Sequence, residues 1–177
     1  MYPIFRLAKE MVKFRNAPAL PTEGVHVSHH ICWPWDIDPW IELNNGRTLT
    51  LFDLGRLPLM HRLGLVQYGK SQNWGLTVAG VSMRYRRRVR AFHRLEMRSR
   101  LLGWDARFFY VEQSMWNRDG ECTGSALIRV AVADSAGIVA PKKMAHGVGW
   151  DENSPALPDW CQAWIAADAQ RPWPPTA

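Results

Sequence analysis

The stretch from residue 33 to residue 64, WPWDIDPWIELNNGRTLTLFDLGRLPLMHRLG, decides the fold of the chain. Its first part carries Asp36, Asp38 and Glu42 among Trp and Pro residues, which is typical of a loop between a strand and a helix. From Thr48 onward it is apolar on almost every side of a helix, and such a helix is expected inside a protein core. The apolar positions are Leu49, Leu51, Phe52, Leu54, Leu57, Met60 and Leu63.

The predicted helix runs from about Asn45 to Leu63 and begins beside the acidic loop. Asn44 or Asn45 is expected to cap it or to orient a substrate, because an Asn side chain accepts hydrogen bonds from free backbone N–H groups. The other N–H groups of the first turn can polarise a carbonyl oxygen. Pro58 is expected to start a second helical segment, since an interior Pro removes a backbone donor. Gly64 is expected to end the helix.

The same stretch resembles the hotdog-fold thioesterases of the 4-hydroxybenzoyl-CoA and acyl-carrier-protein type. Their loop reads roughly D-x-D-x-x-x-H-x-N-N-x-x-Y and precedes a central helix with an acidic-x-x-Arg element. The residues that match are Asp36, Asp38, Asn44, Asn45, Asp53 and Arg56. Glu42 stands in place of the family His, and Thr48 in place of the aromatic residue. The spacing of Asp53 and Arg56 predicts an ion pair on one helix face.

Residues 25–33, VHVSHHICW, are predicted to form the first strand. Side chains alternate along a strand, so His26 and His30 share one face and His29 takes the other. No acidic residue or Cys stands at ligand spacing within the strand. We therefore expect solvent-facing or hydrogen-bonded histidines there, and no metal site.

Four further segments read as strands after a predicted loop at 67–75, and they cover 76–88, 94–102, 106–116 and 122–133. One strand, one buried helix and four consecutive antiparallel strands form an α+β pattern. A curved antiparallel sheet of about five strands, wrapped around one buried central helix, explains why that helix lacks a polar face. This order is also that of the hotdog fold, and the resemblance spans about residues 25–145.

The chain is expected to have three parts. Residues 1–24 form an N-terminal amphipathic helix and a linker, residues 25–145 the hotdog thioesterase-like domain, and residues 146–177 a C-terminal extension with a short helix at 159–170. The chain from residue 138 is expected to be irregular before that helix. The N-terminal helix is expected to dock on the domain or on a partner subunit. Binding at a membrane interface is the less favoured alternative, and it is suggested by the cations that surround Ile4, Leu7, Met11 and Phe14.

Composition limits the function classes. The chain has 177 residues with a net charge of +6, so anions such as nucleic acid, a membrane surface or coenzyme A are candidate partners. No nucleic-acid-binding signature is found, which argues against nucleic acid. No apolar run is long enough for a membrane span, and residues 1–15 lack the core of a secretory signal. The three cysteines, Cys32, Cys122 and Cys161, show no metal or redox spacing, so we expect reduced thiols in a cytoplasmic protein.

The resemblance implies hydrolysis of an acyl-CoA or acyl-carrier-protein thioester. Asp38 matches the family's catalytic aspartate, and Glu42 is expected to assist or replace it. The helix start at Asn45 would supply donors to the oxyanion. The structural alternatives are a turn role for Asp36 and Asp38 and a helix-capping role for Glu42.

Candidate substrate-binding residues surround this loop. They are Asn44, Gly46, Trp40, Arg86, Arg87 and Arg88. Gly46 would allow close approach of a ligand to the backbone. The arginines would contact the phosphates of coenzyme A, or would simply be exposed charges that protect an edge strand.

The resemblance also implies a homodimer or a tetramer, with sites at the subunit boundary. It implies no metal and no cofactor other than coenzyme A as part of the substrate. A non-catalytic hotdog protein that binds acyl-CoA or lipid is the alternative function, because the family His is absent. A hydratase is a third alternative, but its loop signature is not found. The acyl group is left open by the sequence.

Overall fold

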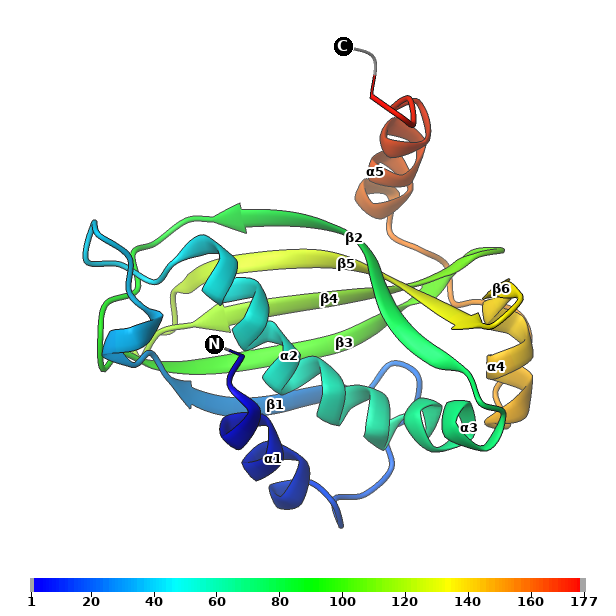
Figure 1. Cartoon of the computed structure of the whole chain (residues 1–177), viewed down its shortest axis with the longest axis horizontal. Coiled ribbons are helices and arrows are strands. Elements are labelled where there is room, and N and C mark those ends of the chain that lie inside the picture. The colour runs from blue at the N-terminus through cyan, green and yellow to red at the C-terminus, as the bar shows by residue number, and fades with distance from the viewer. Residues whose placement is uncertain (1, 176–177) are drawn as a thin grey trace.

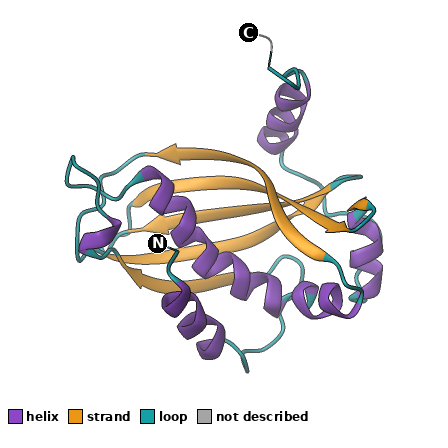
Figure 2. Cartoon of the chain, in the orientation of Figure 1, coloured by secondary structure: helices purple, strands orange, loops and turns teal. Residues whose placement is uncertain are grey.

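The computed structural model describes residues 2–175. The arrangement is α+β, with consecutive strands in one sheet and the helices before and after them in the chain (Figures 1 and 2). The elements are α1 (Ile4–Lys13), β1 (Val25–Ile31), the 3₁₀ helix η1 (Pro34–Asp36), α2 (Asn45–Arg62), α3 (Leu65–Ser71), β2 (Gly75–Tyr85), β3 (Arg94–Trp104), β4 (Phe108–Trp116), β5 (Cys122–Asp134), β6 (Gly137–Val139), α4 (Pro141–Gly147) and α5 (Asp159–Ala169).

One curved sheet holds all the strands, in the order β1-β3-β4-β5-β2, with β6 paired to β5. Every pairing is antiparallel. The sheet curls around α2, which crosses one of its faces (Figure 1). The predicted fold class, the five main strands and the central helix are therefore confirmed.

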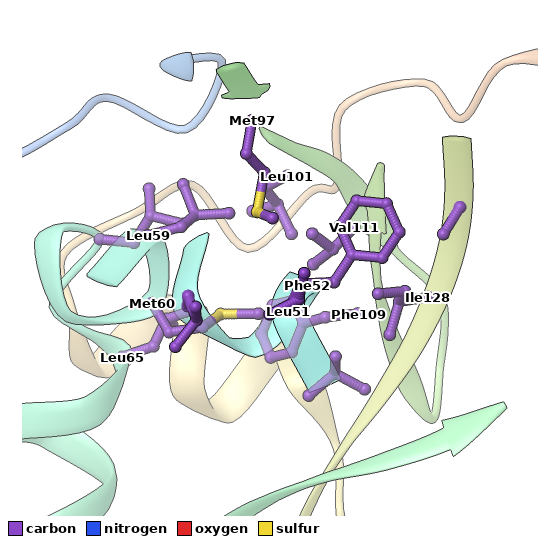
Figure 3. Packing of buried hydrophobic residues seen from close by; sticks show 14 of the residues in the cluster. Leu51, Phe52, Leu59, Met60, Leu65, Met97, Leu101, Phe109, Val111 and Ile128 are labelled. Carbon is purple, nitrogen blue, oxygen red and sulfur yellow. The ribbon is translucent and has the colours of Figure 1, made fainter. Parts of the chain in front are cut away.

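Helix α2 is buried because its apolar side chains fill the curve of the sheet. Leu51, Phe52 and Leu59 pack against residues of β3, β4 and β5, among them Met97 and Val111 (Figure 3). The helix lies close against the sheet at Gly55, where an added Cβ would lie 2.6 Å from Met97 Sδ and 2.8 Å from Ser99 Oγ. A larger residue at this position would push the helix away from the sheet.

The acidic-x-x-Arg element of α2 forms the expected ion pair, between Asp53 and Arg56. Arg56 Nη1 also donates to Gln113 Oε1 at 3.1 Å, and Gln113 Nε2 donates to Ser99 Oγ at 2.7 Å and to the Phe52 carbonyl at 2.9 Å. Burial lowers the pKa of Arg56, while Asp53 opposes that shift. This network satisfies polar groups that would be costly if left unpaired in the core.

The inward face of β1 is polar. His26, Ser28 and His30 are buried there, whereas His29 is exposed, so the predicted division of the histidines is confirmed. His30 Nε2 lies 2.8 Å from Ser28 Oγ. His26 Nδ1 accepts from Arg62 Nη1 at 3.2 Å. Burial, and secondly nearby cations, lower the pKa of His26 to about 4 and that of His30 to about 3.

Three local predictions are wrong. Residues 65–71 form helix α3 where a loop at 67–75 was expected, because Leu65 and Gly69 are buried and hold the segment against its neighbours. The segment after residue 137 is not irregular but forms β6 and α4, since Met144 and Ala145 are fully buried. Pro58 starts no second segment, because α2 continues through it.

The C-terminal helix α5 packs on the sheet face opposite α2. Its Cys161, Trp164 and Ile165 contact Leu102 and Leu127, whose strand neighbours point toward α2. Trp160, which also belongs to α5, is half-exposed. The predicted short C-terminal helix is thus present, and residues 176 and 177 of the predicted extension lie outside the described residues.

Candidate active site

Asp36 anchors the acidic loop to two helices. It is buried at the end of η1, and its carboxylate pairs with Arg6 of α1 at 2.7 Å and with Arg47 of α2 at 3.1 Å. Asp36 Oδ2 also accepts from the Trp33 N–H at 3.0 Å. The first aspartate of the motif therefore fixes the loop and is not free for chemistry.

Asp38 and Glu42 belong to one tight turn. Asp38 Oδ1 accepts from the N–H groups of Trp40 at 2.9 Å and Glu42 at 3.4 Å. The Asp38 N–H in turn donates to the Glu42 carbonyl at 2.8 Å. Ile41 at the tip has a φ of 62°, which is uncommon for a β-branched residue. The turn places two carboxylates directly before α2.

The start of α2 is capped as predicted. Asn44 Oδ1 accepts from the Arg47 N–H at 3.0 Å, so Asn44 is the N-cap. The N–H groups of Asn45 and Gly46 precede the first intrahelical hydrogen bond and point away from the helix. Gly46 is exposed, and an added Cβ there would meet only Asn44 Oδ1, at 3.4 Å. The Asn45 carbonyl accepts from the Tyr85 hydroxyl at 3.2 Å.

A cavity of about 260 Å³ opens beside this helix start. It gathers one carboxylate, the first turn of α2 and three arginines around an apolar wall. Its lining residues are Glu42, Leu43, Asn45, Thr48, Met83, Tyr85, Arg86, Arg87, Arg88, Val89, Met115, Thr123 and Gly124. Burial raises the pKa of the Tyr85 hydroxyl. Mixed apolar and polar linings of this kind are typical of small-molecule sites.

The arginine run after β2 is held by the backbone. The N–H groups of Arg86 and Arg87 both donate to the Thr123 carbonyl, at 2.9 and 3.0 Å. Arg88 Nε lies 3.1 Å from Glu42 Oε2, and this ion pair closes one side of the cavity. The guanidinium groups are exposed while their backbone is fixed, which suits contact with an anion.

The structure therefore brings together Glu42, Asn45 and the arginines 86–88 around one cavity. Four other predicted site residues do not line it, and these are Asp38, Asn44, Gly46 and Trp40. Asn44 serves as the N-cap, and Trp40 is exposed at the turn. The catalytic and binding roles of all nine residues stay predictions.

Sequence reasoning missed the contribution of Tyr85, Thr48 and Thr123 to the cavity. A signal for Tyr85 was available, because strand alternation places it on the same face as Met83. Thr123 gave no such signal, since only the pairing of β2 with β5 brings it to Tyr85.

Among the described residues, no His or Cys lines the cavity at the start of α2. Within residues 2–175, no group of three or more His, Cys, Asp or Glu side chains could hold a metal ion. Cys32 and Cys161 are buried, and burial raises the pKa of each thiol to about 11. No helix in the same part of the chain is long and apolar enough to cross a membrane.

Several curated proteins are similar to part of the chain. Protein THEM6 of Xenopus laevis is 40% identical over 88 residues, which make up 50% of this chain and 42% of that protein. Protein THEM6 of Drosophila melanogaster is 31% identical over 84 residues, which make up 47% of this chain and 44% of that protein. The chain thus spans less than half the length of these curated relatives.

Solved structures share the fold. The probable thioesterase YbaW from Escherichia coli matches with a TM-score of 0.65 at 17% identity, over 70% of this chain and 96% of that chain. The DHNA-CoA thioesterase from Staphylococcus aureus matches with a TM-score of 0.60 at 13% identity, over 82% of this chain and 91% of that chain. At these identities the likeness shows the hotdog fold alone.

A family model gives the assignment. The model described as the thioesterase-like superfamily matches residues 32–165, which include the acidic loop, α2, all of β2 to β5 and most of α5. This match covers well over half of the chain and includes the whole cavity. The chain therefore belongs to the thioesterase-like superfamily.

Proposed function

We propose that the chain hydrolyses an acyl-CoA or acyl-carrier-protein thioester to the free acid and the thiol. One observation carries the proposal, namely the cavity that holds a carboxylate, the start of α2 and three arginines together. Membership of the thioesterase-like superfamily supports it. Each of the three features has a separate part in the reaction.

The start of α2 would stabilise the oxyanion. Attack on a thioester places negative charge on the carbonyl oxygen, and fixed donors at that oxygen usually contribute the largest rate effect. The N–H groups of Asn45 and Gly46 are candidates, because Asn44 already occupies the N–H of Arg47. The helix dipole acts in the same direction. The thiolate is a good leaving group, so the site needs no strong general acid.

A carboxylate of the turn would activate water or attack the carbonyl itself. Asp38 is our first candidate, because it matches the catalytic aspartate of the hotdog-fold thioesterases that the sequence resembles. Glu42 is the assistant or substitute, and it is the carboxylate that lines the cavity of a single chain. Both are held by the same turn directly before α2.

The arginine run would bind the phosphates of coenzyme A or of a carrier-protein arm. Arg86, Arg87 and Arg88 follow one another along the cavity lining, and the backbone N–H groups of Arg86 and Arg87 are held by the Thr123 carbonyl. The apolar part of the wall, with Met83, Val89 and Met115, would then face the acyl group.

We also propose that two copies pair through β2, which would place the cavity at the subunit boundary. Strand β2 is an edge of the sheet and pairs only with β5 within residues 2–175. Tyr85, the last residue of this edge strand, lines the cavity, and Arg86 follows it. We propose a cytoplasmic location as well, because the three cysteines are free thiols.

A non-catalytic acyl-CoA-binding protein is the second candidate. It is favoured by the ion pair between Glu42 and Arg88, which engages the carboxylate that lines the cavity. A binding protein needs the arginines and the apolar wall but no active carboxylate.

Thiol release from a panel of short, long and aromatic acyl-CoAs separates these candidates. The proposal predicts that the full chain hydrolyses at least one member of the panel. Calorimetry measures the binding of coenzyme A separately. Binding of acyl-CoA without turnover of any member would reject the enzyme and support the binding protein.

A further inference from the structure

The outer side of α1 is apolar and open to solvent. Phe5 is 91% exposed, Val12 70% and Ile4 64%. With 3.6 residues per turn, these three and Ala8 fall on one side of the helix. We call Ile4, Phe5, Ala8 and Val12 the apolar stripe.

The stripe belongs to a firmly docked helix, so its exposure is not the fraying of a terminus. Arg6 pairs with Asp36 at 2.7 Å and donates to the Ile31 carbonyl at 2.8 Å. Leu7 packs on the core, and Glu10 is only 1% exposed. Helix α1 lies beside α2 in Figure 1. The domain therefore presents the stripe in a fixed orientation.

The exposed charged residues of α1 and of the turn after it are all positive. Lys9, Lys13 and Arg15 are exposed, whereas the single acidic residue between positions 4 and 15 is the buried Glu10. Lys9 lies 3.4 Å from Glu10 but keeps 70% of its side chain exposed. Helix α1 thus has a docked side, an apolar side and a cationic side.

The cationic side continues into a hollow between α1 and β1. This cavity of about 490 Å³ has three cations and one carboxylate in its lining, which consists of Arg6, Lys9, Glu10, His29, His30, Ile31, Trp33 and Arg94. It is separate from the cavity at the start of α2, with which it shares no lining residue. An anionic headgroup next to the stripe would meet positive charge on this flank.

We propose that the apolar stripe binds the surface of an anionic lipid bilayer. A helix with one apolar side and lysines beside it lies in the interface, with its apolar side among the headgroups and upper acyl chains. A second copy fits less well, because a two-fold contact would bring Lys9 and Lys13 of both copies together, and the acidic residue of α1, Glu10, is buried and already pairs with Lys9. Pairing through β2 would also leave α1 uncovered, since α1 lies near β1 at the other edge of the sheet.

Vesicle flotation tests this surface with the full-length chain. Vesicles of phosphatidylcholine with 30% phosphatidylglycerol should bind the protein at low salt, and pure phosphatidylcholine vesicles should bind it far less. The variant Phe5→Gln/Val12→Gln should bind anionic vesicles at least tenfold less tightly. Lys9→Gln/Lys13→Gln should weaken binding about fivefold for each cation removed.

Two control variants make equal changes elsewhere. Val27→Gln/Ile138→Gln alters exposed apolar residues, and Arg107→Gln/Arg118→Gln removes two exposed cations. Both should bind like the wild type, and circular dichroism should show that all variants fold. Equal vesicle binding by wild type and Phe5→Gln/Val12→Gln would overturn the proposal. So would a loss of mass by that variant in sedimentation equilibrium, because the stripe would then join two copies.

Discussion

At the scale of single residues, the pairing of Glu42 with Arg88 links the two halves of the candidate site. Their charged atoms lie 3.1 Å apart, and both side chains reach water. Exposed pairs contribute little energy, so a phosphate group could displace the carboxylate from Arg88 at low cost. Substrate binding would then free Glu42 as it fills the cavity.

Replacing Arg88 tests whether phosphate is recognised there. We expect Arg88→Gln to raise KM for an acyl-CoA about tenfold, since a hydrogen bond to a charged group contributes about 1.5 kcal/mol. KM for the same acyl group on N-acetylcysteamine, which has no phosphate, should stay the same. The control is Arg90→Gln, because Arg90 is exposed nearby but does not line the cavity. An equal change for both substrates would argue against phosphate contact.

Single residues were only partly predictable. The N-cap role of Asn44 followed from the local preference of Asn, and the structure has it. The anchoring role of Asp36 did not, because its partner Arg6 is 30 residues away in the sequence. Local patterns reveal local hydrogen bonds, whereas partners from distant elements depend on the finished fold.

At the scale of elements, the fit of α2 against the sheet depends on the missing side chain of Gly55. A methyl group there would come closer than 3.0 Å to Met97 and Ser99, so the helix or the strand must shift. Gly46 lies in the same helix but faces open space apart from Asn44. Gly55 and Gly46 can therefore serve as test and control positions for the same substitution by Ala.

We expect Gly55→Ala to lower the free energy of unfolding by about 1–3 kcal/mol relative to Gly46→Ala. Both changes gain helix propensity, so their difference reports mainly the overlap with the sheet. Urea denaturation followed by circular dichroism measures it. Equal stabilities of the two variants would show that α2 has room to move.

The histidines between β1 and α1 predict a pH dependence of stability. In the unfolded chain a His titrates near 6.5, whereas burial lowers the pKa of His26 to about 4 and of His30 to about 3. The unfolded state thus binds more protons between these values. The contribution of these histidines should be constant above pH 7, and stability should fall below pH 6.5 by up to about 1.4 kcal/mol per pH unit for each histidine.

Urea denaturation at pH 7.5, 6 and 5 measures this slope. The variant His30→Gln should lose about half of it, while His93→Gln, which changes an exposed histidine, should keep it. A slope that is the same in wild type and His30→Gln would mean that His30 takes up its proton without unfolding.

At the scale of the whole molecule, two signals were enough to predict the α+β sheet around α2. They are the alternation of apolar and polar residues along the strands and the helix that is apolar on almost every side. Turn residues and period-two patterns are local signals, and each main strand begins within two residues of its expected start. Helices α3 and α4 were missed because their polar sequences become helical only when Leu65 and Met144 are buried. The cavity was missed in part because its walls come from α2, β2, β4 and β5, which no local pattern brings together.

The central claim is that a carboxylate of the turn before α2 drives thioester hydrolysis in this cavity. Thiol release by Asp38→Asn and Glu42→Gln tests it most directly, with the exposed turn residue Asp119→Asn as the matched control. The account predicts that Asp38→Asn lowers kcat by about 10²–10⁴ in a folded protein, that Glu42→Gln lowers it less, and that Asp119→Asn leaves it unchanged. If Glu42→Gln alone removed activity, Glu42 would be the catalytic carboxylate and Asp38 its assistant. Full activity in both folded variants would contradict the account.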